Sequence, residues 1–461
     1  RIKTERLNKM RLLIIVFIFC FELITAQEVQ ENLFGFATSN TFTYCNVNDT
    51  SFMNKITDLN PKLLRFPGGA VGNFYHFGKS GYGFDFAEID QYHDGKVPKR
   101  ARGLENSRIK KNQHQDYIDD FIQLAQETNS KAVLVANLFV DNNDILFMIE
   151  KLATNNIEVV GVELGSELSN RNYFTKGYTI EDYIFSAKSC SKKIKDKYPN
   201  LKTAVVVAPL GKRKGHRHNV WNEKLSKLDF YDAIIIHSYA KVINGKDKDG
   251  QMVFEEAEGK NKTEAFEIYK NRAIDYLVNQ YPKQVQEYVS IFNKPIWVTE
   301  WNLQMSKTTG NTLLQSLFVA NYLLELLSNP DFKNIELTTY HNLGGRDFSG
   351  SIFRNNKDKM EIQSTYYSML MIGKIFKNDI VRVEKELKGE VFTYKCFNEK
   401  GNELFSYSID WNLKEIICYD KSLEINGIIE EAHISSNNLF DLPDINGKFR
   451  LDSIMQIISN E

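Results

Sequence analysis

Strand-like and helix-like segments alternate through most of this chain, and no other feature constrains the fold as strongly. Several of the strand-like runs are continuous and β-branched, which is typical of parallel strands covered on both faces. Eight such runs with helical stretches between them predict a (β/α)₈ barrel. The expected strands are Leu33–Ala37, Lys62–Phe66, Lys131–Asn137, Glu158–Leu164, Thr203–Ala208, Asp232–His237, Pro295–Glu300 and Glu336–His341.

Helical periodicity fills the intervals between these runs. Thr179, followed by Asp182 three residues later, predicts a capping box at one helix start, with Asp in the usual position of Glu. The expected helices include Gln115–Thr128, Ile145–Thr154, Ile180–Lys197, Ala265–Phe292, Leu313–Leu327 and, as the eighth, Met360–Phe376.

The pattern changes near residue 378. Short apolar runs, such as Val391–Cys396 and Leu404–Ile409, are separated there by turn-rich pieces, which indicates a small antiparallel β domain. We therefore assign residues 27–377 to the barrel and residues 378–461 to a C-terminal antiparallel β-sandwich, to which a strand from residues 28–33 could add. The predicted fold class is α/β.

The N-terminus has the layout of an export signal. Lys9 and Arg11 precede the apolar run 12–21, and Ala26 lies at the expected cleavage point. The apolar run is shorter than the roughly 20 residues that a membrane span needs. We expect residues 1–26 to be removed and the protein to be exported, to the periplasm, cell surface or exterior, with no membrane attachment after cleavage.

Charge and cysteine content exclude some classes of function. The net charge of −1 gives no global attraction to nucleic acids or acidic membranes, and we expect no nucleic-acid partner. One of the five cysteines lies within the signal, and no CxxC or Cys/His spacing suggests zinc. Cys396 and Cys418 could pair in an oxidising compartment, or both could be unpaired core residues.

Two glutamates at strand ends are the main candidate functional residues. Glu167 ends the run 159–167, and Glu300 ends the run 294–300. A buried carboxyl group is costly and needs a partner or a function. One such glutamate alone is more often part of a structural ion pair. Because several strand-helix units separate the two, we expect them on opposite walls of one barrel.

Other polar and aromatic residues follow the same barrel edge, where functional groups gather in this fold. We expect Arg65 and Tyr239 to keep Glu300 ionised, since an arginine fork and a phenol both bond a carboxylate. The further candidate substrate-binding residues are Asn137, Ser166, His237, Trp301 and Asn302.

Two carboxyls that flank one cavity are the equipment of glycoside cleavage. One is ionised and acts as the nucleophile, and the other is protonated and acts first as the acid and later as the base. This chemistry needs no cofactor and no metal. A metal-dependent hydrolase is disfavoured because His237 and His341 belong to no HxH or HExxH pattern.

Three segments resemble a known clan of retaining (β/α)₈ glycosidases: Arg65–Gly69 (RFPGG), Glu163–Glu167 (ELGSE) and Thr299–Asn302 (TEWN). They are most similar to the α-L-arabinofuranosidase and heparanase-like (β-glucuronidase) branches, which also have a C-terminal β-sandwich. The resemblance implies that Glu167, after the fourth strand, is the acid/base and that Glu300, after the seventh, is the nucleophile.

One position departs from the clan pattern. The clan has Asn before its acid/base, where the amide binds the sugar 2-hydroxyl, and this chain has Ser166. A hydroxyl is shorter and has a single donor. The sugar's 2-position could differ, a water could fill the gap, or catalysis could have been lost. The last alternative predicts a glycan-binding protein on a degenerate barrel.

Two loops on the same barrel edge are basic. The first, about residues 68–113, is expected to be long and irregular and contains Arg100, Arg102 and several lysines, and the second is 212–218, Lys-Arg-Lys-Gly-His-Arg-His. Arginine forks match carboxylate and sulfate oxygens, so these loops favour an anionic carbohydrate substrate, either uronate-bearing or sulfated. Alternatively, the charges are simply solvated.

Overall fold

The computed structural model describes most of the chain after residue 28. The predicted signal segment lies outside the described residues, so its removal remains a prediction. The described ranges are 29–77, 83–110, 117–140, 143–243, 262–304, 306, 309–345, 350–356, 359–425, 428–436, 444–451 and 454–457.

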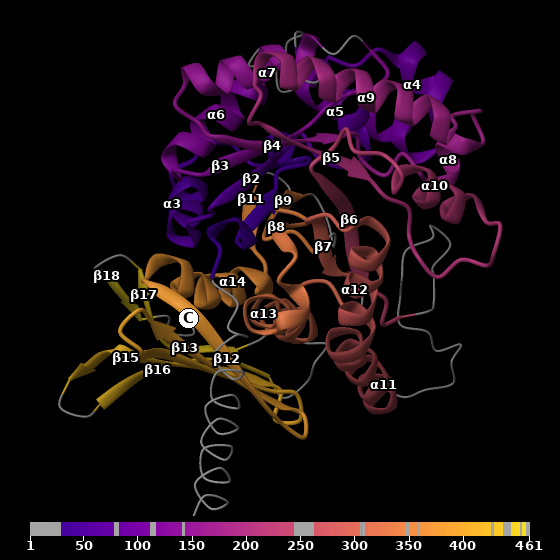
Figure 1. Cartoon of the computed structure of the whole chain (residues 1–461). Coiled ribbons are helices and arrows are strands. Elements are labelled where there is room, and N and C mark those ends of the chain that lie inside the picture. The colour runs from indigo at the N-terminus through magenta and orange to yellow at the C-terminus, as the bar shows by residue number, and fades with distance from the viewer. Residues whose placement is uncertain are drawn as a thin grey trace, which may run out of the picture.

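Eight parallel strands close into a barrel that is surrounded by helices (Figure 1). Each strand pairs with the next one in sequence, and β1 closes the ring by pairing with β8. The predicted (β/α)₈ barrel is confirmed, with every strand in its expected place. The strands are β1 (Gly35–Ala37), β2 (Leu63–Phe66), β3 (Lys131–Val135), β4 (Val159–Leu164), β5 (Lys202–Val206), β6 (Ala233–Ala240), β7 (Ile296–Leu303) and β8 (Ile335–Tyr340).

Helices cover the outside of the barrel at the predicted positions. The capping box of Thr179 and Asp182 is present. A π-helical turn, Tyr276–Gln280, divides the single helix expected over 265–292 into two. No helix within the described ranges is long and apolar enough to cross a membrane. The helices are α2 (Thr41–Tyr44), α3 (Thr50–Leu59), α6 (Tyr117–Glu127), α7 (Asn143–Thr154), α8 (Arg171–Phe174), α9 (Ile180–Lys197), α10 (Arg217–Leu225), α11 (Lys262–Asp275), α12 (Tyr281–Phe292), α13 (Leu313–Ser328) and α14 (Ser364–Gly373), with short 3₁₀ turns at Glu31–Leu33, Pro330–Phe332 and Lys374–Lys377.

The segment after β2 is more regular than expected. In place of a long irregular loop it contains a 3₁₀ turn, Ala70–Phe74, and the helices α4 (Phe86–Tyr92) and α5 (Lys96–Lys110). Helix α5 is rich in charged residues, but Val97, Ala101 and Leu104 are buried. Their spacing of four and three residues puts them on one face of a helix, which explains why the segment folds against the barrel.

The last predicted helix begins four residues later than expected. Residues Lys359–Ile362 form β11, which pairs antiparallel with β10 (Phe353–Asn356), and β10 pairs with the short β9 (Gly344–Gly345). Helix α14 starts only at Ser364. The prediction of helix from Met360 was wrong because a hairpin uses these residues.

The C-terminal region is an antiparallel β domain, as predicted. Its strands follow one another in hydrogen-bonded order, and helices α13 and α14 lie between them and the barrel strands (Figure 1). At the N-terminal end, Val29 makes one backbone hydrogen bond to Val381, but residues Glu31–Leu33 form a 3₁₀ turn, so no strand completes the domain there. The strands are β12 (Ile380–Lys388), β13 (Val391–Asn398), β14 (Glu403–Asp410), β15 (Glu415–Ile425), β16 (Ile428–Ser435), β17 (Asp444–Leu451) and β18 (Ile454–Ile457).

A buried polar network joins α13 to this domain. Tyr394 donates to Glu325 at 2.6 Å, and Lys385 pairs with the same carboxylate at 2.6 Å. Asn321 donates to the Tyr394 hydroxyl at 2.6 Å and accepts from the Trp411 indole at 2.9 Å. Buried polar groups that are bonded to one another in this way fix a single relative position of the two parts.

Cys190, Cys396 and Cys418 are free and buried, and Cys45 is buried as well. Cys396 lies on β13 and Cys418 on β15, with β14 between them. Adjacent strands are roughly 4.8 Å apart, so two strands that flank a third are too distant for a disulfide, which requires Cα atoms within about 7 Å. Of the two alternatives left open by the sequence, the structure has the unpaired one.

Candidate active site

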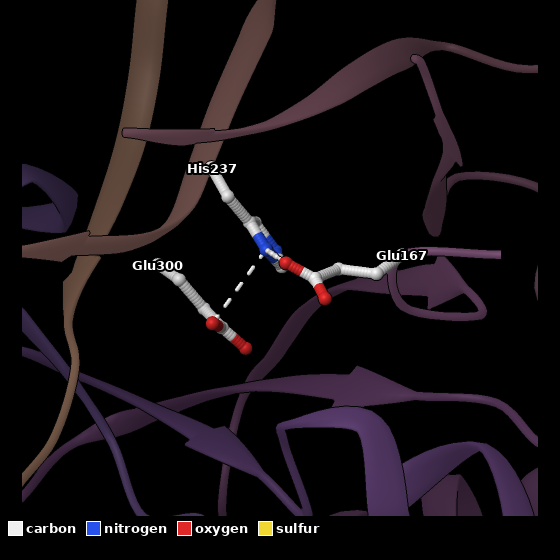
Figure 2. Close-up of side chains that lie close together, drawn as sticks. All are labelled: Glu167, His237 and Glu300. Atoms are coloured by element: carbon white, nitrogen blue, oxygen red, sulfur yellow. Dashed lines mark hydrogen bonds and ion pairs between the residues drawn. The ribbon is translucent and has the colours of Figure 1, made fainter. Parts of the chain in front are cut away.

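The structure brings Glu167 and Glu300 together, with His237 between them (Figure 2). Glu300 lies on β7, His237 lies on β6, and Glu167 lies three residues beyond the end of β4. One carboxylate oxygen of each glutamate and one ring nitrogen of His237 all lie within 4.8 Å of one another. Two residues far apart in sequence therefore face a single space at the carboxyl ends of the barrel strands.

A β-bulge in β7 aims Glu300 into the barrel. Val298 pairs with Ile236 of β6, but the next pair along is Glu300 with His237, so Thr299 is an extra residue. Both Thr299 and Glu300 consequently reach interior groups: Thr299 donates to Glu163 at 3.1 Å, and Glu300 bonds Arg65. Re-aiming a side chain is a known effect of bulges near active sites.

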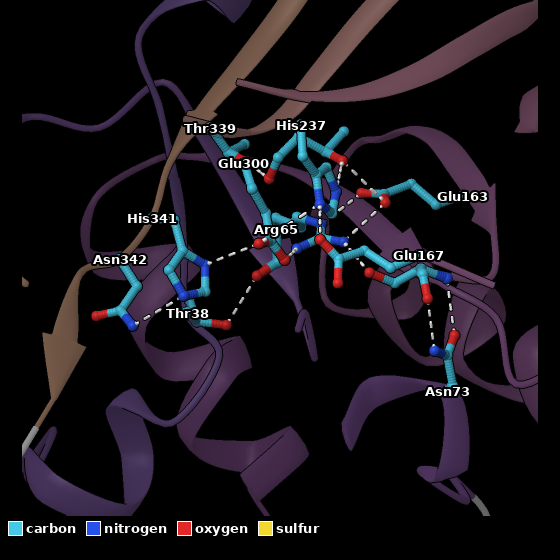
Figure 3. Close-up of polar contacts among 12 residues, drawn as sticks. Thr38, Arg65, Asn73, Glu163, Glu167, His237, Glu300, Thr339, His341 and Asn342 are labelled. Atoms are coloured by element: carbon cyan, nitrogen blue, oxygen red, sulfur yellow. Dashed lines mark hydrogen bonds and ion pairs between the residues drawn. The ribbon is translucent and has the colours of Figure 1, made fainter. Parts of the chain in front are cut away.

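Arg65 connects two carboxylates at the bottom of the site (Figure 3). Its guanidinium holds Glu163 through two bonds, Nε to Oε1 at 2.6 Å and Nη2 to Oε2 at 2.9 Å. Its Nη1 donates to Glu300 Oε1 at 2.8 Å. Burial acts to lower the pKa of Arg65, but the charges of Glu163 and Glu300 raise it above its usual value. The arginine is therefore a fixed cation that both carboxylates share.

The second oxygen of Glu300 is also bonded. Tyr239 donates to Oε2 at 2.7 Å, and His341 Nδ1 lies 3.6 Å from the same atom. Burial acts to raise the pKa of Glu300, but His237, His341, Arg65 and the Tyr239 hydrogen bond together lower it well below its usual value. Burial lowers the pKa of His341, and Arg65 is the fixed positive charge bonded to Glu300. Glu300 is ionised.

The hydrogen bonds of His237 assign its protonation state. Nδ1 lies 3.0 Å from Glu167 Oε1, and Nε2 lies 3.3 Å from Thr299 Oγ1. Because Thr299 gives its one proton to Glu163, its oxygen accepts from Nε2–H, and Nδ1 shares a hydrogen bond with the Glu167 carboxyl. Burial acts to lower the pKa of His237, but the charges of Glu300 and Glu167 raise it. These two charges favour the protonated form of His237.

The backbone at Glu167 has an unusual conformation and is fixed by hydrogen bonds to the preceding residue. Its φ is 53°, a left-handed conformation that is uncommon for a residue with a side chain. The Asn73 amide binds the backbone of the preceding residue on both sides: its Oδ1 accepts from Ser166 N at 2.7 Å, and its Nδ2 donates to Ser166 O at 2.6 Å. The Glu167 side chain is 43% exposed, whereas that of Glu300 is 7% exposed. One carboxyl is therefore at the floor of the site and the other at its rim.

The Ser166 side chain points into the cluster around Arg65. Its hydroxyl is fully buried and accepts from Arg65 Nη2 at 3.2 Å. The short side chain therefore joins the arginine cluster and is not available to a sugar 2-hydroxyl.

Three other candidate substrate-binding residues are engaged elsewhere. Trp301 is buried and stacks on Tyr322 of α13, with ring centroids 4.3 Å apart, because the bulge at Thr299 turns it to the outside of the barrel. Asn302 is fully buried and donates to the carbonyl of His341 at 2.6 Å, so it positions the segment after β8. The Asn137 amide donates to Glu88 of α4 at 3.1 Å. We predicted all three in the site because they lie at strand ends, but position at a strand end does not say which way a side chain points.

The sequence also left some site residues unassigned. Glu163 was visible as a charge in the middle of a buried strand, which is itself an indication of a partner. His341 was visible at the end of β8. Thr299 and Asn73 gave no signal, because the first depends on a bulge and the second lies in a 3₁₀ turn 93 residues before its partner Ser166.

The basic residues of the two loops separate into different environments. Arg102 pairs with Asp90 at 3.1 Å on the surface, and Arg213 is exposed in its loop. Arg217 and His218, by contrast, line a cavity that begins at Glu167. Only part of the predicted basic rim therefore faces the candidate site.

Glu167, His237 and Glu300 are also the group, among the described residues, that could hold a metal ion. Such an ion would have to displace the hydrogen bond between His237 Nδ1 and Glu167, because a ring nitrogen that carries a proton has no free lone pair. It would also compete with Arg65 and Tyr239, which already bond both oxygens of Glu300. The donor set therefore fits a metal poorly.

Comparison with known proteins supports the fold. No family model matches the chain, and no curated protein matches it. Solved structures do match: an arabinofuranosidase from Xanthomonas axonopodis pv. citri (11% identity, TM-score 0.60, covering 92% of this chain and 90% of that one), and the family 51 α-L-arabinofuranosidases of Bifidobacterium longum (10%, 0.60, 94% and 93%) and Thermotoga petrophila RKU-1 (14%, 0.55, 94% and 94%). The resemblance to the arabinofuranosidase branch of (β/α)₈ proteins is therefore confirmed at the level of fold.

Proposed function

We propose that this protein is a retaining glycoside hydrolase in which Glu300 is the nucleophile and Glu167 the acid/base. The observation that supports this most is the pair itself: two carboxyls whose oxygens lie within 4.8 Å, one buried and held ionised, the other half exposed. Retaining enzymes hold these groups about 5–5.5 Å apart, whereas inverting enzymes leave roughly 6.5–9.5 Å for a water. The short separation favours double displacement.

The contacts of each glutamate match its proposed role. Arg65 and Tyr239 orient the Glu300 carboxylate for attack on the anomeric carbon and keep it charged until the covalent bond forms. Glu167 protonates the departing oxygen and then, as the base, takes a proton from the water that releases the sugar. His237, which bonds Glu167 and lies 3.6 Å from Glu300, couples the protonation of the two groups.

The hydrolase proposal is tested with a panel of neutral and charged polysaccharides. The unmodified protein should generate new reducing ends from at least one of them, and Glu300→Ala should generate none. Glu336→Gln is the matched control, because Glu336 lies at the start of β8 and bonds Lys202 and Trp297, away from the site. Reducing ends that persist in Glu300→Ala would exclude the assigned nucleophile.

The acid and nucleophile roles are distinguished with substrates whose leaving groups differ in their need for protonation. Glu167→Gln should retain attack on activated aryl glycosides, whose leaving groups scarcely need protonation, and lose natural glycosides. Glu300→Gln should lose both. Equal loss on both substrate types in Glu167→Gln would contradict the acid role, and inhibition of the unmodified protein by a chelator would favour a metal at the same three residues.

A second candidate function is glycan binding without cleavage. The buried Ser166 hydroxyl supports it, since the amide that the clan uses at this place is missing. The same panel separates the two functions: a glycan that is retained by the protein but never shortened supports a binding protein.

Export after cleavage near Ala26 also belongs to the proposal. N-terminal sequencing of the protein secreted by an expressing cell tests it.

A further inference from the structure

A cavity of about 230 Å³ opens beside Glu167. His237 also lines it, but Glu300, Arg65 and Tyr239 do not. The remaining walls come from β5 and the segment after it, from β6, from the start of α8 and the segment before it, from α10 and from α12. In a retaining glycosidase the acid/base contacts the leaving group, so on the proposed function this cavity is where the sugar on the departing side would lie.

A second hollow, of about 360 Å³, continues the path away from Glu167. Ser169, Arg217 and His218 line both hollows, so they form the boundary between them. Phe174, whose side chain is 55% exposed, and Lys224 line the outer one. Two hollows in series suit a chain of sugar units better than one small ligand, and an exposed aromatic ring offers a face to a sugar.

The inner hollow contains two cations without an anionic partner. Among the described residues, neither Arg171 nor Arg217 forms an ion pair, although both line the hollow. Arg217 donates to the carbonyl of Ser169 at 3.4 Å and lies over the ring of Phe174 at 5.5 Å, both uncharged groups. Lys224 of the outer hollow, by contrast, is paired with Glu181.

The surroundings of Arg217 make this lack of a counterion costly. Burial lowers the pKa of Arg217, and the neighbouring charge of Arg171 lowers it further. Its Nε is shielded from solvent and has no hydrogen-bond partner. His218 is 8% exposed, and its ring nitrogens have no hydrogen-bond partner either, while burial and the charge of Arg217 lower its pKa to about 4. His218 is therefore neutral and offers polar atoms to a ligand at neutral pH.

We propose that these hollows are the leaving-group side of the substrate cleft and that Arg217, with Arg171 beside it, binds the carboxylate of an acidic sugar residue there. A planar guanidinium matches a carboxylate through two parallel hydrogen bonds. A bound carboxylate would also remove the repulsion between the two arginines. This inference rests on the proposed function for its orientation, and it specifies the substrate class as uronate-bearing glycans.

The test measures binding in a Glu300→Gln background, where turnover is blocked. Three tetrasaccharide probes share one backbone: the first has hexuronate carboxylates, the second is carboxyl-reduced and neutral, and the third is reduced and then O-sulfated. Calorimetry should show that Arg217→Gln weakens binding of the carboxylate probe tenfold or more and leaves the neutral probe unchanged. Arg213→Gln, an exposed arginine of the same loop that does not line the hollows, is the matched control and should change neither.

Thermal melts test whether the Arg217→Gln variant is folded. If it is not, Arg171→Gln replaces it, since the Arg171 side chain is exposed, with an expected loss of about threefold to tenfold. Equal weakening of the carboxylate and neutral probes, or no stronger binding of the carboxylate probe than of the neutral one by the parent, would overturn the inference. Preference for the sulfated probe would overturn the assignment to a carboxylate.

The outcomes also distinguish this inference from the hydrolase proposal. Cleavage of neutral glycans by the unmodified protein, unaffected by Arg217→Gln, would remove the acidic-sugar site and leave the hydrolase. Arg217-dependent binding of the carboxylate probe, with no cleavage of any glycan by the unmodified protein, would remove the hydrolase and leave the site for the acidic sugar.

Discussion

Within the part of the chain that the structure describes, charged side chains are paired at the floor of the site and unpaired at its rim. At the floor, Arg65 has two carboxylates within 2.9 Å, and both oxygens of Glu300 are bonded. At the rim, beyond Glu167, Arg171 and Arg217 lie near each other and form no ion pair with any described residue. Among the described residues, the charges at the floor are thus paired with one another, whereas those of Arg171 and Arg217 at the rim are not.

On the proposed function, this difference is the one expected between a catalytic centre and a recognition surface. Charges that must be ready before the substrate arrives are fixed by protein groups, because such preorganisation costs nothing at the moment of reaction. Charges that select a substrate are left unmatched, because an analogue that lacks the complementary group then leaves them desolvated and unpaired. The floor alone would act on many glycosides, and the rim would choose among them.

The largest effect is expected from removing the cation at the floor. Arg65→Met leaves Glu163 and Glu300 buried without their shared partner, and breaking such a buried pair costs about 3–5 kcal/mol of unfolding free energy. Glycoside cleavage should be abolished as well. Arg102→Met, which removes an exposed arginine paired at 3.1 Å, should cost less than about 1 kcal/mol. Chemical denaturation measures both, and similar costs would contradict the distinction between a buried network and a surface pair.

A smaller effect is expected from Tyr239→Phe. The hydroxyl stabilises ionised Glu300, so its loss should raise the depressed pKa of Glu300. The acid limb of the activity profile should then move to higher pH, because a larger fraction of Glu300 is protonated at each pH below neutrality. A hydrogen bond to a charged group is worth about 1.5–3 kcal/mol, so the rate should fall roughly 10- to 100-fold.

The control for this change is Tyr276→Phe, whose hydroxyl bonds Ser238 and does not touch Glu300. Its acid limb should stay in place. A profile that shifts equally in both variants would show that the hydroxyl of Tyr239 does not act on the carboxylate.

The smallest effect on activity is expected from removing Asn73, which binds the backbone next to Glu167. Asn73→Ala releases the peptide group that precedes Glu167, at a cost of about 1–3 kcal/mol, and should lower cleavage of natural glycosides about tenfold more than cleavage of activated aryl glycosides. Asn222→Ala removes the same two-sided grip from Ala208, with bonds of 2.7 and 2.9 Å. It should destabilise the protein comparably without changing that ratio. An unchanged ratio in Asn73→Ala would show that Glu167 is positioned by other contacts.

The fold could be predicted because its cause is local. Continuous apolar runs alternate with helical periodicity, and parallel strands buried on both faces leave that pattern in any sequence. The residues brought to the floor, Arg65, Tyr239 and Glu300, were predictable for the same reason, since strand ends meet at one edge. Helix α5 was missed even though Val97, Ala101 and Leu104 have helical spacing, because its many charges obscured three apolar positions.

Side-chain direction could not be predicted in the same way. A single extra residue, Thr299, reverses which side chains of β7 point inward, so Glu300 reaches Arg65 while Trp301 packs against α13. Bulges depend on pairing with neighbouring strands, and a sequence read one segment at a time does not contain that information. Asn73 was missed for a related reason, because its function exists only once Ser166 lies beside it.

Helix α13 is buried along almost its whole length, from Leu313 to Leu327, since the barrel covers one face and the C-terminal sheet another. This helix is buried on all sides, and its polar residues Asn321 and Glu325 are bonded to groups of the C-terminal sheet. The small domain is therefore part of the wall that holds β7 in place, and it is not an appendage that evolution or an engineer could exchange freely. A chain shortened to its barrel would expose this face of α13 and leave Asn321 and Glu325 without their partners in the sheet.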